Sequence, residues 1–166
     1  NYDRLIEIYE ALAAHGYREV GQEYLQNVLD TAKQLDAYDS GRIYYYLGEY
    51  QKAYLALDEA RDKGGADSYL YLGRAYAATG DYNYASSVYN NYLSKQGPNA
   101  EIYNELGLCE MAKKEYQNAL AAFQAGKQIE GNSLMQTLCF NEIVAYEYLE
   151  DYQQAEVLMN AYLQNY

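Results

Sequence analysis

The sequence predicts an all-α protein built as a solenoid of about five helical hairpins, and three observations support this prediction. Residues 68–93 hold two stripes of tyrosine and apolar side chains at helical spacing. Gly80 and Asp81 separate these stripes, in the way that a glycine ends one helix and an aspartate begins the next. A small residue also recurs along the chain at intervals near 34 residues, which is typical of a solenoid.

The recurring small residue forms a ladder along the chain. Its members each follow a tyrosine by three residues, at spacings of 33, 32, 34 and 36 residues: Val20, Ala53, Ala85, Ala119 and Ala155. We expect them to lie buried where the two helices of each hairpin cross, because a small side chain lets the helices approach. Fourteen of the 24 tyrosines fall at repeat positions, so we expect core packing to explain most of the tyrosine content.

The hairpins follow one another at boundaries rich in glycine. Gly64 and Gly65, Gly97 to Asn99, and Gly131 with Asn132 mark joins between repeats. Asp151 and Gln154 resemble a capping box at the start of the last helix. These signals divide the chain into repeats over residues 1–33, 34–65, 66–99, 100–133 and 134–166, and we expect the repeats to form one domain over 1–166.

At these positions the chain resembles the tetratricopeptide repeat (TPR) family, whose pattern is a Trp slot, then Leu-Gly, Tyr, Ala, Phe and Pro. Residues 66–99 match the pattern best, with Tyr69, Leu72, Gly73, Tyr76, Ala85, Tyr89 and Pro98. In residues 100–133, Glu110 stands in the Tyr slot, whereas residues 1–33 keep mainly Tyr17, Val20 and Tyr24. The resemblance implies a right-handed α-α superhelix whose first helices line a concave groove that binds peptide segments.

Composition argues against several classes of function. The net charge is −12, from 12 basic and 24 acidic residues, which disfavours nucleic acid as a partner. The single histidine, His15, and the two cysteines, Cys109 and Cys139, provide no metal site, and we expect no cofactor and no catalysis. No apolar run is long enough to cross a membrane. We expect a soluble protein, either cytoplasmic or an extracytoplasmic domain of a larger or processed protein.

The groove positions of the TPR family can be carried over to this chain slot by slot. They are Tyr38, Arg42, Tyr45, Tyr46, Leu70, Arg74, Asn104 and Leu108. Arg42 and Arg74 occupy equivalent slots, and two roles stay open for them. Each arginine pairs with a neighbouring acid such as Glu49 or Asp67, or both fix a carboxylate or acidic side chain of the partner. We expect Tyr45 rather than Tyr46 to face the groove, since adjacent helical residues point in different directions.

The function that these features favour is a non-catalytic protein–protein interaction scaffold that binds a peptide or partner segment in its groove. The alternative is a structural module that self-assembles into a homo-oligomer through its last helix. The apolar face of that helix carries Val157, Leu158, Ala161 and Tyr162. We also expect Cys109 and Cys139 to be poorly accessible, as small buried hydrophobic residues, with Cys139 in the Trp slot of its repeat. We expect both to be reduced, because they occupy different slots on neighbouring first helices.

Overall fold

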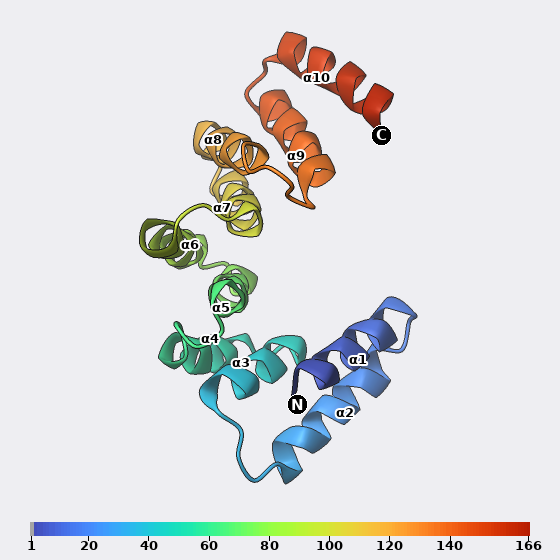
Figure 1. Cartoon of the computed structure of the whole chain (residues 1–166), viewed down its shortest axis with the longest axis vertical. Coiled ribbons are helices and arrows are strands. Elements are labelled where there is room, and N and C mark those ends of the chain that lie inside the picture. Colours follow the sequence, from blue (N-terminus) through green and yellow to red (C-terminus); the bar gives the residue numbers. More distant parts are fainter. Residues whose placement is uncertain (1) are drawn as a thin grey trace. The chain divides into compact units, whose positions relative to one another are not determined.

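The computed structural model describes residues 2–166, and within that range it contains ten α-helices and no β-strand (Figure 1). The helices are α1 (Tyr2–Ala14), α2 (Arg18–Thr31), α3 (Ala37–Tyr46), α4 (Tyr50–Glu59), α5 (Ala66–Ala78), α6 (Tyr82–Gln96), α7 (Ala100–Ala112), α8 (Tyr116–Lys127), α9 (Met135–Tyr148) and α10 (Tyr152–Asn165). The prediction of ten helices and no sheet is confirmed for these residues.

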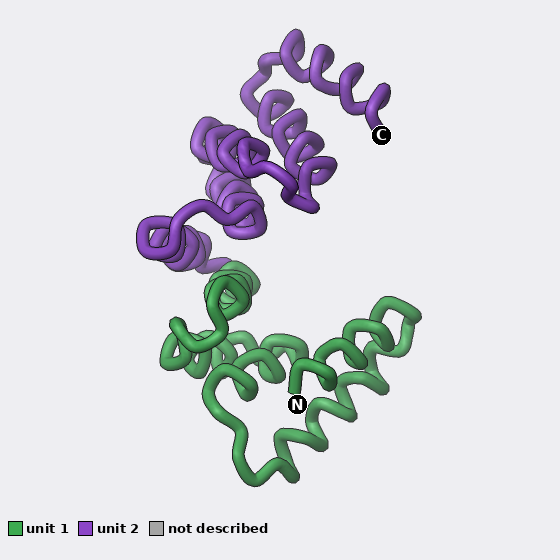
Figure 2. Tube along the Cα trace, viewed as in Figure 1, with its two compact units in different colours: residues 1–79 green, residues 80–166 purple. Residues whose placement is uncertain are grey.

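The helices form two compact units, which Figure 2 shows in different colours. Unit 1 ends at Thr79 and contains α1–α5, and unit 2 runs from Gly80 to Tyr166 and contains α6–α10. In unit 1, α1 packs on α2, α3 packs on α4, and α5 packs on both α3 and α4. In unit 2, each helix packs on the next one along the chain. A single domain over residues 1–166 stays a prediction.

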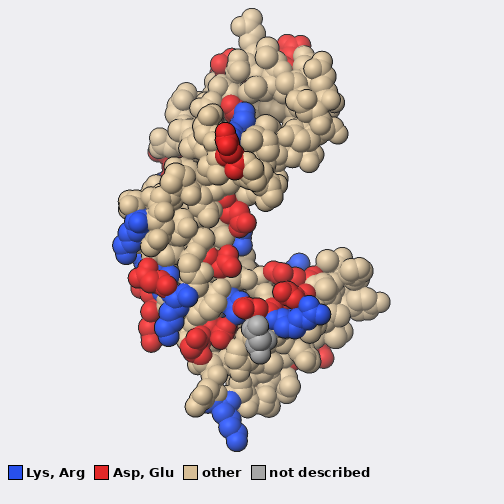
Figure 3. All heavy atoms as spheres, viewed as in Figure 1, with Lys and Arg blue, Asp and Glu red and all other residues tan. Residues whose placement is uncertain are grey.

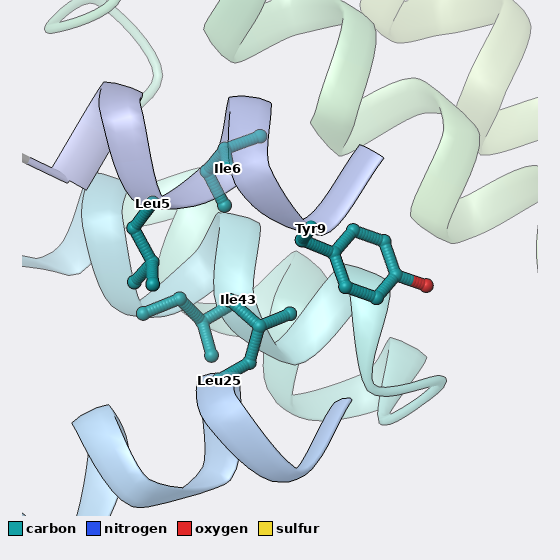
Figure 4. Packing of buried hydrophobic residues seen from close by; sticks show 5 residues of the cluster. All are labelled: Leu5, Ile6, Tyr9, Leu25 and Ile43. Carbon is teal, nitrogen blue, oxygen red and sulfur yellow. The ribbon is translucent and has the colours of Figure 1, made fainter. Parts of the chain in front are cut away.

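Each unit has its own hydrophobic core. In unit 1, side chains from α1, α2 and α3 form one cluster (Figure 4), namely Leu5, Ile6, Tyr9, Leu25 and Ile43. The Tyr9 ring lies at the edge of this cluster, with its hydroxyl directed away from the other four side chains. In unit 2, the corresponding cluster consists of Ala119, Leu120, Phe123, Leu138 and Ala145. Each fully buried large apolar side chain contributes about 1.5–3 kcal/mol to stability. The cores therefore hold the hairpins of each unit together without a sheet.

The small-residue ladder is buried in four of the five repeats. Ala53, Ala85, Ala119 and Ala155 are all at most 1% exposed. Val20, however, is 53% exposed, so its predicted burial is wrong. The small residue at this hairpin is Gly21, where an added Cβ would lie 2.7 Å from Cδ2 of Tyr9. In the first repeat the first helix supplies the large ring and the second helix supplies the small residue.

The tyrosines occupy more exposed positions than core packing alone predicts. Only Tyr9, Tyr69 and Tyr89 are buried among the described tyrosines. Tyr17 and Tyr24, which fall at repeat positions, are exposed large side chains on or beside α2. Most other rings are half-buried, so they cover the edges of the helices with the hydroxyl still able to reach water. Most of the tyrosine content therefore covers helix surfaces rather than filling the core.

The turn inside each hairpin uses one backbone geometry at equivalent positions. The second residue after the first helix has positive φ in every repeat, at Gly16, Gly48, Gly80, Lys114 and Glu150. Around Lys114, the amide of Glu115 donates to the carbonyl of Glu110 at 2.9 Å, and that of Lys114 donates to Met111 at 3.0 Å. This pair of hydrogen bonds is a Schellman motif, which favours glycine at the positive-φ position. The last two repeats therefore carry a strained residue there.

Side-chain caps begin several helices as the sequence predicts. Asp151 accepts a hydrogen bond from the amide of Gln154 at 3.2 Å, which confirms the cap expected at the start of α10. Asp36 and Asn99 accept equivalent bonds at the starts of α3 and α7, at 2.8 and 3.0 Å. Each such cap satisfies an amide that has no partner within its helix. The caps thus fix where the first helices of repeats two and four begin.

Candidate protein-binding surface

The structure places the eight predicted groove residues on three helices. Tyr38, Arg42, Tyr45 and Tyr46 lie on α3, Leu70 and Arg74 lie on α5, and Asn104 and Leu108 lie on α7. The first six belong to unit 1 and the last two to unit 2. Tyr38, Tyr45, Tyr46 and Arg74 are half-buried and Leu108 is exposed, whereas Arg42, Leu70 and Asn104 are buried. Five of the eight residues therefore have surface that a partner can reach.

Arg42 forms a buried ion-pair network. Its side chain is 7% exposed, its Nη1 donates to Oδ1 of Asp3 at 2.7 Å, and its Nη2 pairs with Asp39. The guanidinium also lies 4.3 Å from the centre of the Tyr38 ring. The ion-pair role is thus confirmed for Arg42, but the partners are Asp3 and Asp39 rather than Glu49. Glu49 pairs with Lys52 instead.

The charges around α3 set the titration of its side chains. Burial lowers the pKa of Arg42, but its hydrogen bonds to Asp39 and Asp3 outweigh burial and raise that pKa overall. Burial raises the pKa of the Tyr38 hydroxyl to about 12, although the Arg42 charge opposes the rise. Basic and acidic side chains lie beside one another on the face of unit 1 seen in Figure 3. Arg42 is therefore already neutralised by acids of its own chain.

Five tyrosines meet between α1, α3, α4 and α5, and we call Tyr9, Tyr45, Tyr46, Tyr50 and Tyr71 the tyrosine cluster. The ring centres of Tyr9 and Tyr46 are 4.8 Å apart, and those of Tyr45 and Tyr46 are 5.2 Å apart. Tyr71 of α5 lies 5.6 Å from Tyr45 and 5.7 Å from Tyr46. Tilted and edge-on contacts of this kind stabilise aromatic pairs beyond their buried area.

Tyr46 is the hydrogen-bonding centre of the cluster. Its hydroxyl donates to Oε1 of Glu10 at 2.6 Å and lies 2.9 Å from the hydroxyl of Tyr71. Its carbonyl accepts from Nε2 of Gln22 at 3.2 Å and from the hydroxyl of Tyr9 at 3.4 Å. Burial raises the pKa of Tyr46 above its ordinary value of 10.0, and its contacts with Glu10 and Tyr71 raise it further. The hydroxyl of Tyr46 therefore stays protonated at neutral pH.

A cleft of about 370 Å³ opens beside the cluster. It lies between the C-terminal ends of α1 and α3 and the N-terminal ends of α2 and α4, and its walls are formed by Tyr9, Glu10, Ala13, Arg18, Gln22, Tyr45, Tyr46, Gly48 and Tyr50. Tyr45 and Tyr46 both line it, although they are adjacent on α3. Which of the two faces the predicted groove stays a prediction. The cleft surrounds the C-terminal end of α3, where long side chains on adjacent residues reach the same space.

Sequence reasoning missed four residues of this surface, namely Asp3, Tyr9, Glu10 and Tyr71. The first three lie on α1, whose repeat pattern is the weakest in the chain. Tyr9 occupies the position that Gly41 holds in the second repeat, 32 residues later. Once Gly21 is taken as the small residue of the first repeat, this equivalence places Tyr9 at the hairpin crossing. That register was the signal that could have identified it.

Three further residues singled out from the sequence lie in unit 2, where contacts within the fold account for most of them. In unit 2, Asn104 accepts a hydrogen bond from Nδ2 of Asn141 at 2.8 Å, which ties α7 to α9. Cys109 is buried as expected, and burial raises the pKa of its thiol to about 12. Burial of Cys139 is a wrong prediction, because this residue is half-buried and lies in the wall of a cleft between α9 and α10. Both thiols are free.

A metal-binding cluster or a long apolar helix would support other functions. No set of three metal-binding side chains comes together within residues 2–166. In the same range, every helix is too short or too polar to span a membrane. His15 is exposed at the end of α1, where its Nδ1 lies 2.8 Å from the carbonyl of Ala11. The main surface features are therefore the tyrosine cluster and the clefts between helices.

Ten helices that pack in sequence within each unit, without a strand over residues 2–166, define a helical-repeat protein. A sequence profile of the tetratricopeptide repeat family matches residues 38–83 and 72–132, which together span more than half of the chain. The chain belongs to the tetratricopeptide repeat family, whose members are generally non-catalytic scaffolds that bind other proteins. Comparison with curated protein sequences gives no significant match.

Solved structures share the fold over nearly the whole chain. MamA residues 41 to the end, from Desulfovibrio magneticus RS-1, align with a TM-score of 0.70 and 17% identity, covering 98% of this chain and 93% of MamA. The TPR-like repeats of a putative kinesin light chain from Podosopora anserina align with a TM-score of 0.71 and 18% identity, covering 98% of this chain and 93% of that one. Cut9–Hcn1, an APC/C hetero-tetramer, aligns with a TM-score of 0.64 and 20% identity, covering 99% of this chain and 36% of that one. These similarities confirm the all-α helical-repeat fold class.

Proposed function

We propose that this chain is a non-catalytic scaffold that binds a peptide segment of a partner protein, with the tyrosine cluster of unit 1 as the anchoring site. The observation that carries the proposal is the cleft of about 370 Å³ walled by Tyr9, Tyr45, Tyr46 and Tyr50. Tyrosine is enriched among residues that dominate binding energies, because a rigid ring loses little entropy on binding. A large apolar or aromatic side chain of the segment fills the cleft.

Within unit 1 the rest of the peptide contacts the predicted residues of α3 and α5, and the exposure of each residue decides its role. Tyr38, Tyr45, Tyr46 and Arg74 of unit 1 present surface to the segment. In unit 2, taken by itself, Leu108 presents an exposed apolar side chain that a partner can contact. Of the buried residues, Arg42 packs 4.3 Å from the centre of the Tyr38 ring, Leu70 belongs to the core, and Asn104 joins α7 to α9 through Asn141. The proposal thus keeps the predicted surface and assigns direct contact to its accessible members.

An acidic or carboxylate group on the partner forms part of the proposal. Such a group binds Arg42 only by replacing Asp3, whose side chain is 64% exposed and can turn toward water. Asp39, with a 20% exposed side chain, stays with the guanidinium and holds it in place. A charge-assisted hydrogen bond to a partner carboxylate would therefore exchange one acid for another.

A peptide selection experiment tests the site. A displayed random-peptide library is selected on the wild-type chain, and the best peptide is titrated by calorimetry against wild type, Tyr45→Ala and Tyr24→Ala. Loss of an anchoring tyrosine costs about 2 kcal/mol or more, so Tyr45→Ala should weaken binding about 30-fold. The matched control Tyr24→Ala removes an exposed ring on α2 and should change affinity less than twofold.

Two outcomes would oppose the proposal. If Tyr45→Ala binds the peptide as tightly as wild type, and if Tyr45→Ala and Tyr24→Ala both melt at the wild-type temperature, the tyrosine cluster is not the binding site. Selected peptides without acidic residues, or peptides that bind equally after their acids are changed to amides, would remove the carboxylate from the proposal and leave the aromatic site standing.

Self-association through α10 is a second candidate, and the exposure of this helix favours it. Val157 is 61% exposed and Leu163 is 68% exposed, which places two large apolar side chains of one helix in solvent. Light scattering over a range of concentrations tests it. A dimer that forms in the wild type and is absent in the double variant Val157→Lys, Leu163→Lys would support this function. A wild-type chain that stays monomeric at every concentration would exclude it.

A further inference from the structure

A second cleft, distinct from the tyrosine cluster, lies in unit 2 between α6, α7 and α8. It has a volume of about 330 Å³ and is walled by Asn90, Tyr103, Leu106, Glu110, Asn118, Ala121 and Ala122. Glu110 is the charged residue of this wall and is only 6% exposed. Carboxylates are rarely buried to this degree unless they are paired.

Glu110 stands where the other repeats place an aromatic ring. It precedes the ladder residue Ala119 by nine residues, as Tyr44, Tyr76 and Tyr146 precede Ala53, Ala85 and Ala155. In unit 1 the ring of Tyr76 stacks on Tyr54 with centres 4.4 Å apart. The fourth repeat thus brings a carboxylate to a position that is otherwise aromatic.

One oxygen of the Glu110 carboxylate lacks a hydrogen-bond partner. Its Oε1 accepts from Nζ of Lys113 at 3.0 Å, whereas Oε2 is buried without a hydrogen bond from any described residue. A buried oxygen that has lost its water is costly to leave unpaired. Lys113 therefore balances the charge of Glu110 but does not complete its hydrogen bonding.

The remaining wall of the cleft suits a planar cation. Asn90 and Asn118 carry amide oxygens that accept hydrogen bonds, and Tyr103 carries an aromatic ring. A guanidinium group has five N–H donors in one plane and stacks on aromatic faces, which an ammonium group does less well. Unit 2 itself contains no arginine, and it carries eleven acidic residues against four lysines. Charge complementarity therefore favours a basic partner.

We propose that this cleft binds an arginine side chain of a partner protein, with its guanidinium donating to Oε2 of Glu110 and stacking near Tyr103. The arginine supplies the hydrogen bond that the carboxylate lacks. This site does not depend on the tyrosine cluster, because it lies in the other unit and takes the opposite charge. Failure at one site leaves the other proposal standing.

The test uses three capped five-residue peptides of glycine and serine with a central arginine, lysine or citrulline. Binding is followed through the NMR signals of the Asn90 and Asn118 side-chain amides. The arginine peptide should shift both signals to saturation. The citrulline peptide, which keeps the shape but not the charge, should bind at least about tenfold more weakly.

Three variants refine the test. Glu110→Gln removes the charge and should weaken the arginine peptide about tenfold. Lys113→Gln removes the internal cation and should strengthen the arginine peptide instead. The matched control Glu101→Gln changes an exposed acid on the same helix and should leave binding within about twofold. Melting curves show whether each variant is folded.

The peptide series alone can overturn the proposal, so the result does not depend on whether Glu110→Gln folds. Equal shifts by the arginine and citrulline peptides would exclude recognition of the charge. Equal affinity for the arginine and lysine peptides would exclude selection for guanidinium. Weaker arginine binding by Lys113→Gln would show that Glu110 does not receive the ligand.

Discussion

Replacing Gly107 by alanine tests the close packing of α7 against α8. A Cβ at this position would lie 2.3 Å from Cε1 and 2.6 Å from Cδ1 of Phe123. The Phe123 ring is fully buried and cannot swing into solvent. Either the ring or the helix must therefore move to accept one methyl group.

The magnitude follows from two opposing effects. Alanine is about 1 kcal/mol more favourable than glycine inside a helix. Overpacking a core costs about 1–3 kcal/mol, and the upper part of that range applies where the contact is to a buried ring. We expect Gly107→Ala to destabilise unit 2 by about 1–2 kcal/mol. Each kilocalorie lowers the melting temperature by about 2–4 °C in a chain of this size.

Thermal melts of four variants measure this effect. In a Phe123→Leu background, Gly107→Ala should be neutral or stabilising, which gives a coupling energy of about 1–2 kcal/mol. The control is Gly126→Ala, where an added Cβ would lie 3.0 and 3.1 Å from the Cδ atoms of Leu138 and 3.3 Å from Cβ of Tyr103, which is a looser fit than at Gly107. It should change stability by less than about 0.5 kcal/mol. A higher melting temperature for Gly107→Ala in the wild-type background would refute the packing argument.

Three more predictions concern the turns, the thiols and the titration of Tyr38. Lys114→Gly should stabilise the chain by about 0.5–1 kcal/mol in urea melts, because Lys114 has a φ of 63°; an unchanged midpoint would contradict this. A thiol reagent should label Cys139 much faster than Cys109, because Cys109 is buried and has its pKa raised to about 12; equal rates would oppose it. The pKa of Tyr38 is raised from 10.0 to about 12 in the folded chain, so the unfolded chain loses the hydroxyl proton at a lower pH than the folded chain does. The free energy of unfolding should therefore fall between pH 10.0 and about pH 12, and it should fall less steeply in Tyr38→Phe.

The sequence was sufficient to predict the helices, because the spacing of apolar side chains along the chain indicates which face of each helix is buried. That reasoning located Ala53, Ala85, Ala119 and Ala155 correctly. It failed at Val20 because it placed the small residue three positions after an aromatic ring. In the other four repeats the tyrosine is the first residue of the second helix, whereas Tyr17 lies one residue before α2. The fourth residue of α2 is therefore Gly21, and the crossing uses Gly21 instead.

The candidate site was harder to predict because its contacts join distant segments. Arg42 and its partner Asp3 are 39 residues apart, and Tyr46 and Glu10 are 36 residues apart. Local spacing cannot select one carboxylate from 24 acidic residues. Only the packing of α1 on α3, with Tyr9 against Tyr46, brings these groups together. Sequence slots therefore pointed to residues of α3 but not to the residues of α1 that lie against them.

Hydrogen–deuterium exchange with and without a selected peptide tests the central claim most directly, because it reports which helices a ligand covers. The account predicts slower amide exchange at the C-terminal ends of α1 and α3, around Tyr9 and Tyr46, and no change in α10. The same peptide should give no protection in Tyr45→Ala at equal concentration. Protection confined to α10, or spread over helices far in sequence from the tyrosine cluster with α3 unchanged, would contradict the account.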